Sequence, residues 1–213
     1  MKLIGMLDSP YVRRVAVAAR LLGLPFEHAP VSVFSTFDAF ARINPVVKAP
    51  TLVCDDGSVL MDSGLIIDWL ETVAGRSLWP ADASARLRAL RLVGLALAAC
   101  DKSVQMVYER ELRPEGRQHA PWLERVQGQQ RAALRALDAE LAAAPLATDA
   151  SGLGNAGLTA AVVWRFLQLR PETAAGAADC PALAAFTHEV EALPAFAEIP
   201  ADERFTIVAG RAA

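Results

Sequence analysis

Three short stretches of the sequence bring together polar side chains that could do chemistry. The first is Ser9-Pro10-Tyr11-Val12, which follows a strand-like run. Serine is favoured at the N-cap of a helix and proline at its first position, so the stretch predicts a helix start. The Ser9 oxygen would accept from the N–H of Val12 and keep its own hydrogen for a ligand. Because the N-terminal end of a helix is positive, that ligand is best a thiolate, and the alternative is a helix cap alone.

The second stretch covers residues 44–52 and reads NPVVKAPTL. Pro50 stands at the entrance of a predicted strand. A proline at this point leaves the main chain of Ala49 free to pair with an extended peptide, and Lys48 adds a cation beside it. The alternative is a strand-edge proline with a solvated lysine, and these residues taken alone favour it.

The third stretch covers residues 61–70 and reads MDSGLIIDWL. Asp62 or Ser63 caps a helix there, and capping alone is again the alternative. The same geometry suits a zwitterionic ligand. The N–H groups at a helix start and a serine hydroxyl bind a carboxylate, and Asp62 can accept from an ammonium group.

The elements that must position these stretches alternate over the first 75 residues. In order, we expect a strand at 2–6, a helix from 10 to 22, a strand at 26–33, a short helical piece at 37–43, a hairpin with strands at 51–54 and 59–61, and a helix that ends at Gly75. Apolar residues recur at helical spacing in both long helices and flank a turn signal in the hairpin.

The remainder of the chain has a different composition. Ala-rich and Leu-rich helical patterns run over about 85–112, 119–144, 155–170 and 181–193. We therefore predict an α/β plus all-α protein, with a thioredoxin-like N-terminal domain at 1–76, a linker at 77–84 and an all-helical domain at 85–213.

Composition excludes several classes of function. The 213 residues carry a net charge of −3 without a cluster of Lys and Arg, so nucleic acid is not an expected partner. The longest apolar run, residues 92–100, falls well short of the roughly 18 residues of a membrane span. Cys54, Cys100 and Cys180 lie far apart, which is typical of a reducing cytoplasm, and the three histidines show no metal-ligand spacing.

Taken together, the three stretches resemble the glutathione transferase family, in its cytosolic, bacterial-like type with a serine at the catalytic position. The resemblance lies in S-P-Y-x-x-R at 9–14, N-P-x-x-K-x-P at 44–50 and D-S at 62–63, in this order and ahead of a helical domain. It implies the thioredoxin-like and helical domains just described and a homodimer. It also implies glutathione as a substrate, with no metal.

The resemblance assigns a role to each stretch. It implies a cis bond before Pro50 and pairing of the Ala49 main chain with the cysteinyl part of glutathione. Asp62 and Ser63 would hold the γ-glutamyl end, and Lys48 would lie near the backbone or a carboxylate of the tripeptide. The implied glutathione-binding residues are Ser9, Lys48, Ala49, Pro50, Asp62 and Ser63.

The implied activity is conjugation of glutathione to an apolar electrophile, a detoxification reaction, with Ser9 facing the sulfur as the catalytic residue. Tyr11 is a rival hydroxyl, although on a helix it would point about 200° away from the cap. The candidate electrophile pocket consists of Tyr11, Met106, Tyr108 and Arg110. For the residues on the first long helix, packing between helices and a solvated arginine are an equal alternative.

Two other functions stay open. A protein with this fold could bind glutathione or an apolar ligand, or act as a regulatory partner, without turnover. A glutaredoxin-like reductase would need Cys-Pro-Tyr-Cys, where this chain has Ser9 and Val12, so no thiolate remains for disulfide exchange. That function would require Cys54 to lie at the cleft, and the hairpin prediction places Cys54 elsewhere.

Two positions depart from the family pattern. Val47 stands where the loop usually has glycine, and a β-branched residue disfavours positive φ, which bears on the path of the loop and the aim of Lys48. A later helix usually opens with a Ser/Thr-x-x-Asp box, but Gly154 and Gly157 occupy the matching positions. We therefore expect an under-capped helix, with Asn155 as a substitute cap, that a restored box would stabilise.

Overall fold

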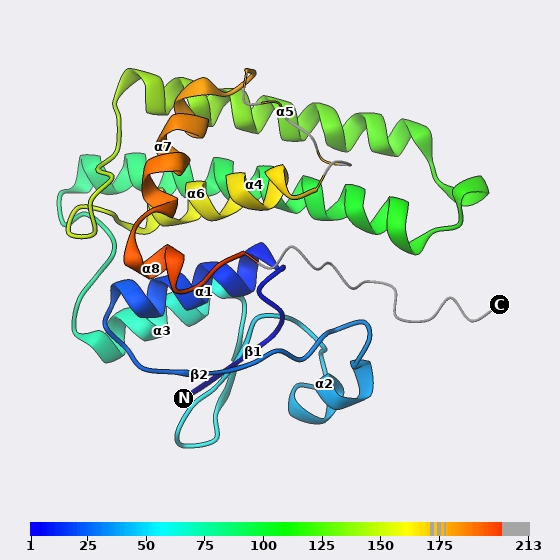
Figure 1. Cartoon of the computed structure of the whole chain (residues 1–213), viewed down its shortest axis with the longest axis horizontal. Helices are drawn as coiled ribbons and strands as arrows, with labels where there is room; N and C mark the ends of the chain where they lie inside the picture. The colour runs from blue at the N-terminus through cyan, green and yellow to red at the C-terminus, as the bar shows by residue number, and fades with distance from the viewer. Residues whose placement is uncertain (171–172, 174–175, 177, 202–213) are drawn as a thin grey trace. The chain divides into compact units, whose positions relative to one another are not determined.

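A computed structural model describes residues 1–170, 173, 176 and 178–201 of the chain (Figure 1). The chain forms two compact units. One contains Met1–Ser77 and the segment that begins at Pro194, and the other contains Leu78–Leu193. Residues 194–201 therefore pack with the N-terminal unit, whereas the sequence predicts them as part of the helical domain. Residues 202–213, the end of that predicted domain, lie outside the described residues.

The N-terminal unit is thioredoxin-like, with a four-stranded mixed sheet in the order β2-β1-β3-β4. The strands are β1 (Lys2–Ile4), β2 (Glu27–Ala29), β3 (Thr51–Val53) and β4 (Val59–Met61). Strand β1 runs parallel to β2, and β3 runs antiparallel to both of its neighbours. The hairpin was predicted correctly, but β2 is much shorter than the predicted strand at 26–33.

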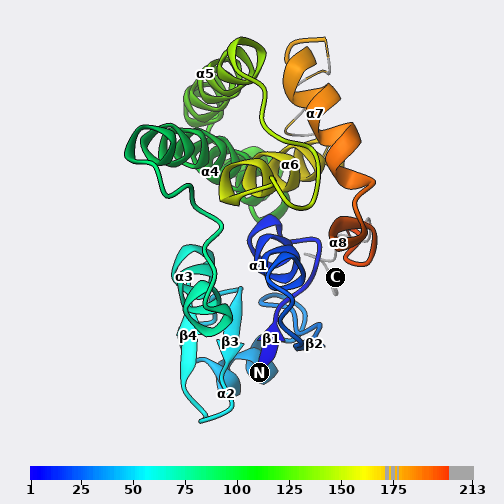
Figure 2. The ribbon, with the colours of Figure 1, turned by 90° about the vertical axis from the view of Figure 1, so that its left-hand side faces the viewer.

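Two long helices cover one face of this sheet. Helices α1 (Pro10–Leu21) and α3 (Ser63–Ala74) pack side by side (Figure 2), and the short helix α2 (Phe37–Ile43) links β2 to β3. The predicted apolar face of α1 is buried as expected, from Val12 to Leu22. Arg13 and Arg14 on the same helix are also buried, which the pattern of apolar residues did not indicate.

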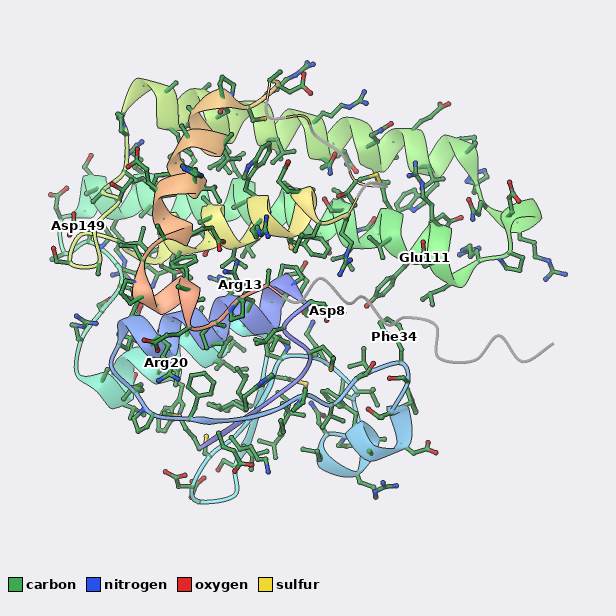
Figure 3. The ribbon with its side chains drawn as sticks, in the orientation of Figure 1. Asp8, Arg13, Arg20, Phe34, Glu111 and Asp149 are labelled. Atoms are coloured by element: carbon green, nitrogen blue, oxygen red, sulfur yellow. The ribbon has the colours of Figure 1, made fainter. Side chains whose placement is uncertain are left out.

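The segment that begins at Pro194 is held on α1 by arginines. Its short helix α8 (Pro194–Ala197) packs on α1. The Arg13 guanidinium lies 5.6 Å from the centre of the Phe196 ring, and its Nε donates to the carbonyl oxygen of Ile199 at 2.9 Å. Arg20 lies about two turns further along the same face of α1, and its Nε is 3.5 Å from the Glu198 carboxylate (Figure 3). These contacts fix the returning segment against the first helix of the chain.

The second unit is helical. Its elements are α4 (Ala83–Leu112), the 3-10 helix η1 (Glu115–Arg117), α5 (Ala120–Ala143), α6 (Asn155–Gln168) and α7 (Pro181–Glu191). The two long helices α4 and α5 lie side by side, and α6 packs against α4 and α7 (Figure 1). All four long helices were predicted, although α4 begins inside the predicted linker because Asp82 caps it by accepting from the Ala85 N–H at 2.8 Å.

The start of α6 has no side-chain cap at Gly154, as expected, but a main-chain oxygen takes the place of the cap. The N–H of Asn155, its first residue, donates to the main-chain oxygen of Leu78 at 2.9 Å. A Cβ atom at Gly154 would lie 2.6 Å from that same oxygen, so glycine is required for the close approach. Asn155 is the first residue of α6 rather than its N-cap, and its side-chain oxygen accepts from Thr159 within the helix.

Helices α5 and α7 are also capped from a distance. The N-caps of these helices, His119 and Cys180, make no side-chain capping bond. Instead, Glu109 on α4 accepts from the His119 N–H at 2.9 Å, and Asp138 on α5 accepts from the Leu183 N–H at 2.8 Å. None of the helices in the described part of the chain combines the length and apolar character that crossing a membrane requires.

Candidate functional site

The register of the sheet brings the three predicted stretches to one end of it. Ile4, the last residue of β1, pairs with Thr51, and Thr51 pairs with Met61, the last residue of β4. Adjacent strands lie about 4.8 Å apart. The loop to α1, the residues before β3 and the start of α3 therefore all emerge at this Ile4 end of the sheet.

Ser9 is the N-cap of α1, as predicted. Its backbone is extended, and its Oγ accepts from the Val12 N–H at 3.5 Å, which is a long bond. Pro10 follows at the first helical position. Because Oγ acts here as an acceptor, the hydroxyl hydrogen of Ser9 remains available to a ligand. Val12, one turn on, is fully buried.

Gly5 packs between the first stretch and the second. Its φ of 136° is unfavourable for any residue with a side chain. A Cβ atom at this position would lie 2.6 Å from Cγ2 of Val12 and 3.3 Å from Cβ of Ala49. Ala49 is thus held next to the first turn of α1, and glycine makes that contact possible.

Two buried side chains hold the loop that carries Lys48 and Ala49. The Asn44 side chain donates to Oγ1 of Thr51 at 2.9 Å and accepts from the Val46 N–H at 3.0 Å. Thr51 Oγ1 in turn donates to the Lys48 carbonyl oxygen at 2.7 Å. Asn44 and Thr51 therefore connect the two ends of the loop. Asn44 opens the N-P-x-x-K-x-P motif, and the motif alone does not indicate its contact with Thr51.

Within this loop, the peptide bond before Pro50 is cis, as the resemblance implied. Val47 has a φ of 52°, so it adopts the left-handed conformation in spite of its branched side chain. A non-glycine residue in a sparsely populated region costs of order 1–3 kcal/mol. The loop thus keeps a left-handed turn before Lys48, whose side chain is exposed.

The start of α3 carries the third stretch. Asp62 is the N-cap, with a φ of 73°, and its Oδ1 accepts from the Gly64 N–H at 2.8 Å. Ser63, the first helical residue, is 4% exposed, and its Oγ accepts from Nη1 of Arg14 at 3.0 Å. Arg14 ends the S-P-Y-x-x-R motif, but the sequence assigned it no role, because its contact with Ser63 joins two helices and leaves no local signal.

The candidate electrophile residues lie in both units, and the structure describes each by itself. Tyr11 is half-buried on α1. On α4, Met106 is 1% exposed, whereas Tyr108 and Arg110 are exposed. Met106 thus contributes to the interior of the helical unit. The role of these four residues in binding an electrophile stays a prediction.

Cys54 stands at the other end of the sheet. It follows Val53, which pairs with Lys2 at the start of β1. Burial raises the pKa of the Cys54 thiol, and the nearby Asp56 carboxylate raises it further. Both effects disfavour a thiolate there. Among the described residues, no three His, Cys, Asp or Glu side chains cluster as metal ligands would.

Comparisons with known proteins agree with this fold. A sequence model described as the N-terminal domain of glutathione S-transferase matches residues 3–77. A crystal structure of a glutathione S-transferase from Methylobacterium radiotolerans in complex with glutathione sulfonate is 31% identical, with a TM-score of 0.85, and the match covers 96% of this chain and 97% of that one. The chain belongs to the glutathione transferase family.

Two further relatives are similar to most of the chain. A family member from Pseudomonas fluorescens Pf-5 with bound S-(propanoic acid)-glutathione is 32% identical, with a TM-score of 0.77 over 93% of this chain and 98% of that one. The Escherichia coli protein called uncharacterized GST-like protein YibF is 28% identical over 163 residues, which are 76% of this chain and 80% of that protein.

Proposed function

We propose that the protein is an active glutathione transferase, which conjugates glutathione to an apolar electrophile with Ser9 as the catalytic residue. The observation that carries this proposal is the meeting of Ser9, Ala49 and Ser63 with their loops at the Ile4 end of the sheet. Family members at 31% and 32% identity are described with glutathione sulfonate and a glutathione conjugate bound, which supports the same ligand here.

The proposed binding follows from the groups at this end of the sheet. The main chain of Ala49, next to the cis bond, pairs with the cysteinyl residue of glutathione. The γ-glutamyl carboxylate accepts from Ser63 and from the N–H groups at the start of α3, where negative charge is favoured. The second oxygen of Asp62 accepts from the γ-glutamyl ammonium. Lys48 attracts a carboxylate of the tripeptide.

The reaction requires a thiolate. The thiol of bound glutathione gives its proton to solvent, and the Ser9 O–H donates to the resulting sulfur anion at the start of α1. The sulfur electron pair then forms a bond to an electrophilic carbon, and the leaving group departs with the electrons of the bond that breaks. A hydrogen bond to a charged group contributes about 1.5–3 kcal/mol. At 1.36 kcal/mol per unit, the thiol pKa falls by about one to two units.

The test is the pH–rate profile of wild type and Ser9→Ala with one reactive aryl halide, together with glutathione affinity from calorimetry. We expect the conjugation rate at pH 7 to fall about ten-fold to a hundred-fold with nearly unchanged affinity. The deficit should shrink at high pH, where the thiol ionises unaided. Superimposable profiles would reject Ser9 and favour Tyr11. Tight binding without turnover across a panel of electrophiles would identify a non-catalytic binding or regulatory protein.

We extend the proposal to a homodimer in the cytoplasm. Leu65, Trp69 and Val73 form an exposed apolar stripe on α3, and Leu65 is 66% exposed. A contiguous exposed apolar patch is typical of an interaction surface. The cysteines in the described part of the chain are free, as in a reducing compartment. Sedimentation velocity should give a dimer that Leu65→Glu dissociates, and a monomeric wild type would reject this assembly.

A further inference from the structure

The buried arginine next to the proposed site calls for an explanation. Arg14 is 2% exposed, and its Nη1 donates to Oγ of Ser63, which is 4% exposed. Arginine is rarely fully buried unless its charge and its N–H donors have specific partners, and Ser63 is one partner of Arg14. We propose that Arg14 is a positioning residue that orients the Ser63 hydroxyl as a donor to the α-carboxylate of the γ-glutamyl group. The inference rests on the proposed binding of glutathione.

The argument begins with the direction of the hydrogen bond. A guanidinium group has five N–H donors and no acceptor, so Ser63 can only accept from Arg14. The hydrogen of Ser63 must therefore point away from Arg14. A serine hydroxyl without such a partner rotates and can either donate or accept. Arg14 thus removes the arrangement in which Ser63 would present a lone pair to an anion.

The positive charge of Arg14 also favours an anion next to Ser63. Arginine stays protonated at every pH at which the protein would be studied. Its cation lies beside the start of α3, where the first N–H groups of the helix already favour negative charge. The Asp62 side chain accepts from Gly64 at this start, which leaves the N–H of Ser63 as a further donor. The preference for a carboxylate should therefore not vary with pH between about 6 and 9.

Arg13 provides a matched control in the neighbouring position. It is also 2% exposed and lies on the same helix. Its Nε donates to the carbonyl oxygen of Ile199, and its guanidinium lies over Phe196, so it holds the returning segment. Loss of Arg13 should lower stability without a change in ligand selectivity, whereas loss of Arg14 should change selectivity.

The experiment compares two ligands by calorimetry at pH 7: glutathione, and an analogue in which 4-aminobutyrate replaces the γ-glutamyl residue and so lacks its α-carboxylate. We expect Arg14→Met to weaken glutathione binding about ten-fold or more and to leave the analogue within about three-fold. Arg14→Met combined with Ser63→Ala should lose no more than the larger single loss. Arg13→Met should leave the ratio of the two affinities unchanged.

If Arg14→Met does not fold, two conservative variants test whether Arg14 orients the Ser63 hydroxyl. Arg14→Lys is still a pure donor and should keep most of the preference for glutathione. Arg14→Gln carries an acceptor that can take the Ser63 hydrogen, and should lose that preference. Equal losses for both ligands, or an unchanged ratio in folded Arg14→Met or Arg14→Gln, would overturn the inference. A wild type that binds neither ligand would overturn the proposed function, and the inference with it.

Discussion

Helices α1 and α3 of the N-terminal unit begin differently from α5, α6 and α7 of the helical unit, whose fourth long helix, α4, has a local cap in Asp82. In the N-terminal unit, Ser9 and Asp62 cap α1 and α3 from the chain position immediately before each helix. In the helical unit, α6 begins against the carbonyl oxygen of Leu78, α7 against Asp138 and α5 against Glu109. Leu78 and Asp138 are distant in sequence from the helices that they cap, and Glu109 lies on the preceding long helix.

This difference bears on where a ligand can bind. The first N–H groups of a helix have no partner within the helix, so they are free to bind either a capping group or a ligand. In α5, α6 and α7 the protein itself satisfies some of them, which stabilises the bundle. In α1 and α3 a short local cap takes one N–H, and the adjoining residues at the Ile4 end of the sheet are those to which we assign the proposed binding of glutathione. Substitutions at these helix starts test the difference.

The largest effect should come from placing a local cap on α6. Gly154→Ser with Gly157→Asp adds a Cβ 2.6 Å from the Leu78 oxygen and another 2.4 Å from Cδ1 of Leu153. Overpacking costs about 1–3 kcal/mol per site, and a buried carboxylate adds to it, so we expect a loss of about 3–5 kcal/mol in urea unfolding. Gly128→Ala on α5, where a Cβ meets nothing, should instead stabilise by about 0.5–1 kcal/mol. Stabilisation by the double change would contradict the distant cap.

The next effect concerns α7. Asp138→Ala removes the acceptor for the Leu183 N–H, and a hydrogen bond to a charged group contributes about 1.5–3 kcal/mol. We expect a loss of about 2 kcal/mol in urea unfolding, and Asp138→Asn, which keeps an acceptor, should recover most of it.

Burial and then Asp138 raise the pKa of the Cys180 thiol to about 11. Its alkylation at pH 8 should therefore accelerate in Asp138→Ala, and an unchanged rate and stability would remove Asp138 as the cap.

A smaller effect is expected at α1. The Ser9 bond to Val12 is 3.5 Å long, so Ser9→Ala should cost less than about 1 kcal/mol in urea unfolding. The same change is expected to lower conjugation at pH 7 at least ten-fold, so stability and activity should separate. If the protein loses stability in proportion to activity, Ser9 is chiefly a structural cap.

The smallest change in the free energy of unfolding is expected at Val47, where the substitution should stabilise the protein. Val47→Gly relieves the left-handed backbone of a branched residue but makes the unfolded chain more flexible, so we expect a net gain of about 0.5–1 kcal/mol. Val46→Gly, next to it and without a positive φ, should destabilise by a similar amount. Equal losses from both changes would show that the left-handed turn carries no strain.

Sequence patterns were sufficient for most of the fold. The hairpin of β3 and β4, the apolar face of α1 and the four long helices follow from local periodicity and turn residues. The local caps Ser9 and Asp62 were predictable for the same reason. By contrast, the start of α6 depends on the approach of Leu78, and the proximity of Arg14 to Ser63 depends on how α1 packs on α3. Contacts between residues that are far apart in the sequence produce no periodic pattern of apolar residues.

The site was predicted to a similar extent. The order of the three stretches suggested that they act together, and the register of Ile4, Thr51 and Met61 supplies the physical reason. The left-handed Val47 was not expected, because the propensity of a single residue is weaker than the bonds from Asn44 and Thr51 that hold its loop. Asn44 and Arg14 stand in the motifs, but the sequence assigned them no role, because their contacts with Thr51 and Ser63 appear only in the folded chain.

The return of the last described residues to the first helix has a consequence for how the chain is made. The N-terminal unit contains residues 1–77 but also the segment from Pro194, which Arg13 holds through Ile199. A ribosome releases that segment only after the whole helical unit has been synthesised. We therefore expect a nascent chain stopped at residue 193 to hold an N-terminal unit with Arg13 lacking its carbonyl partner, a state on which chaperones and proteases can act.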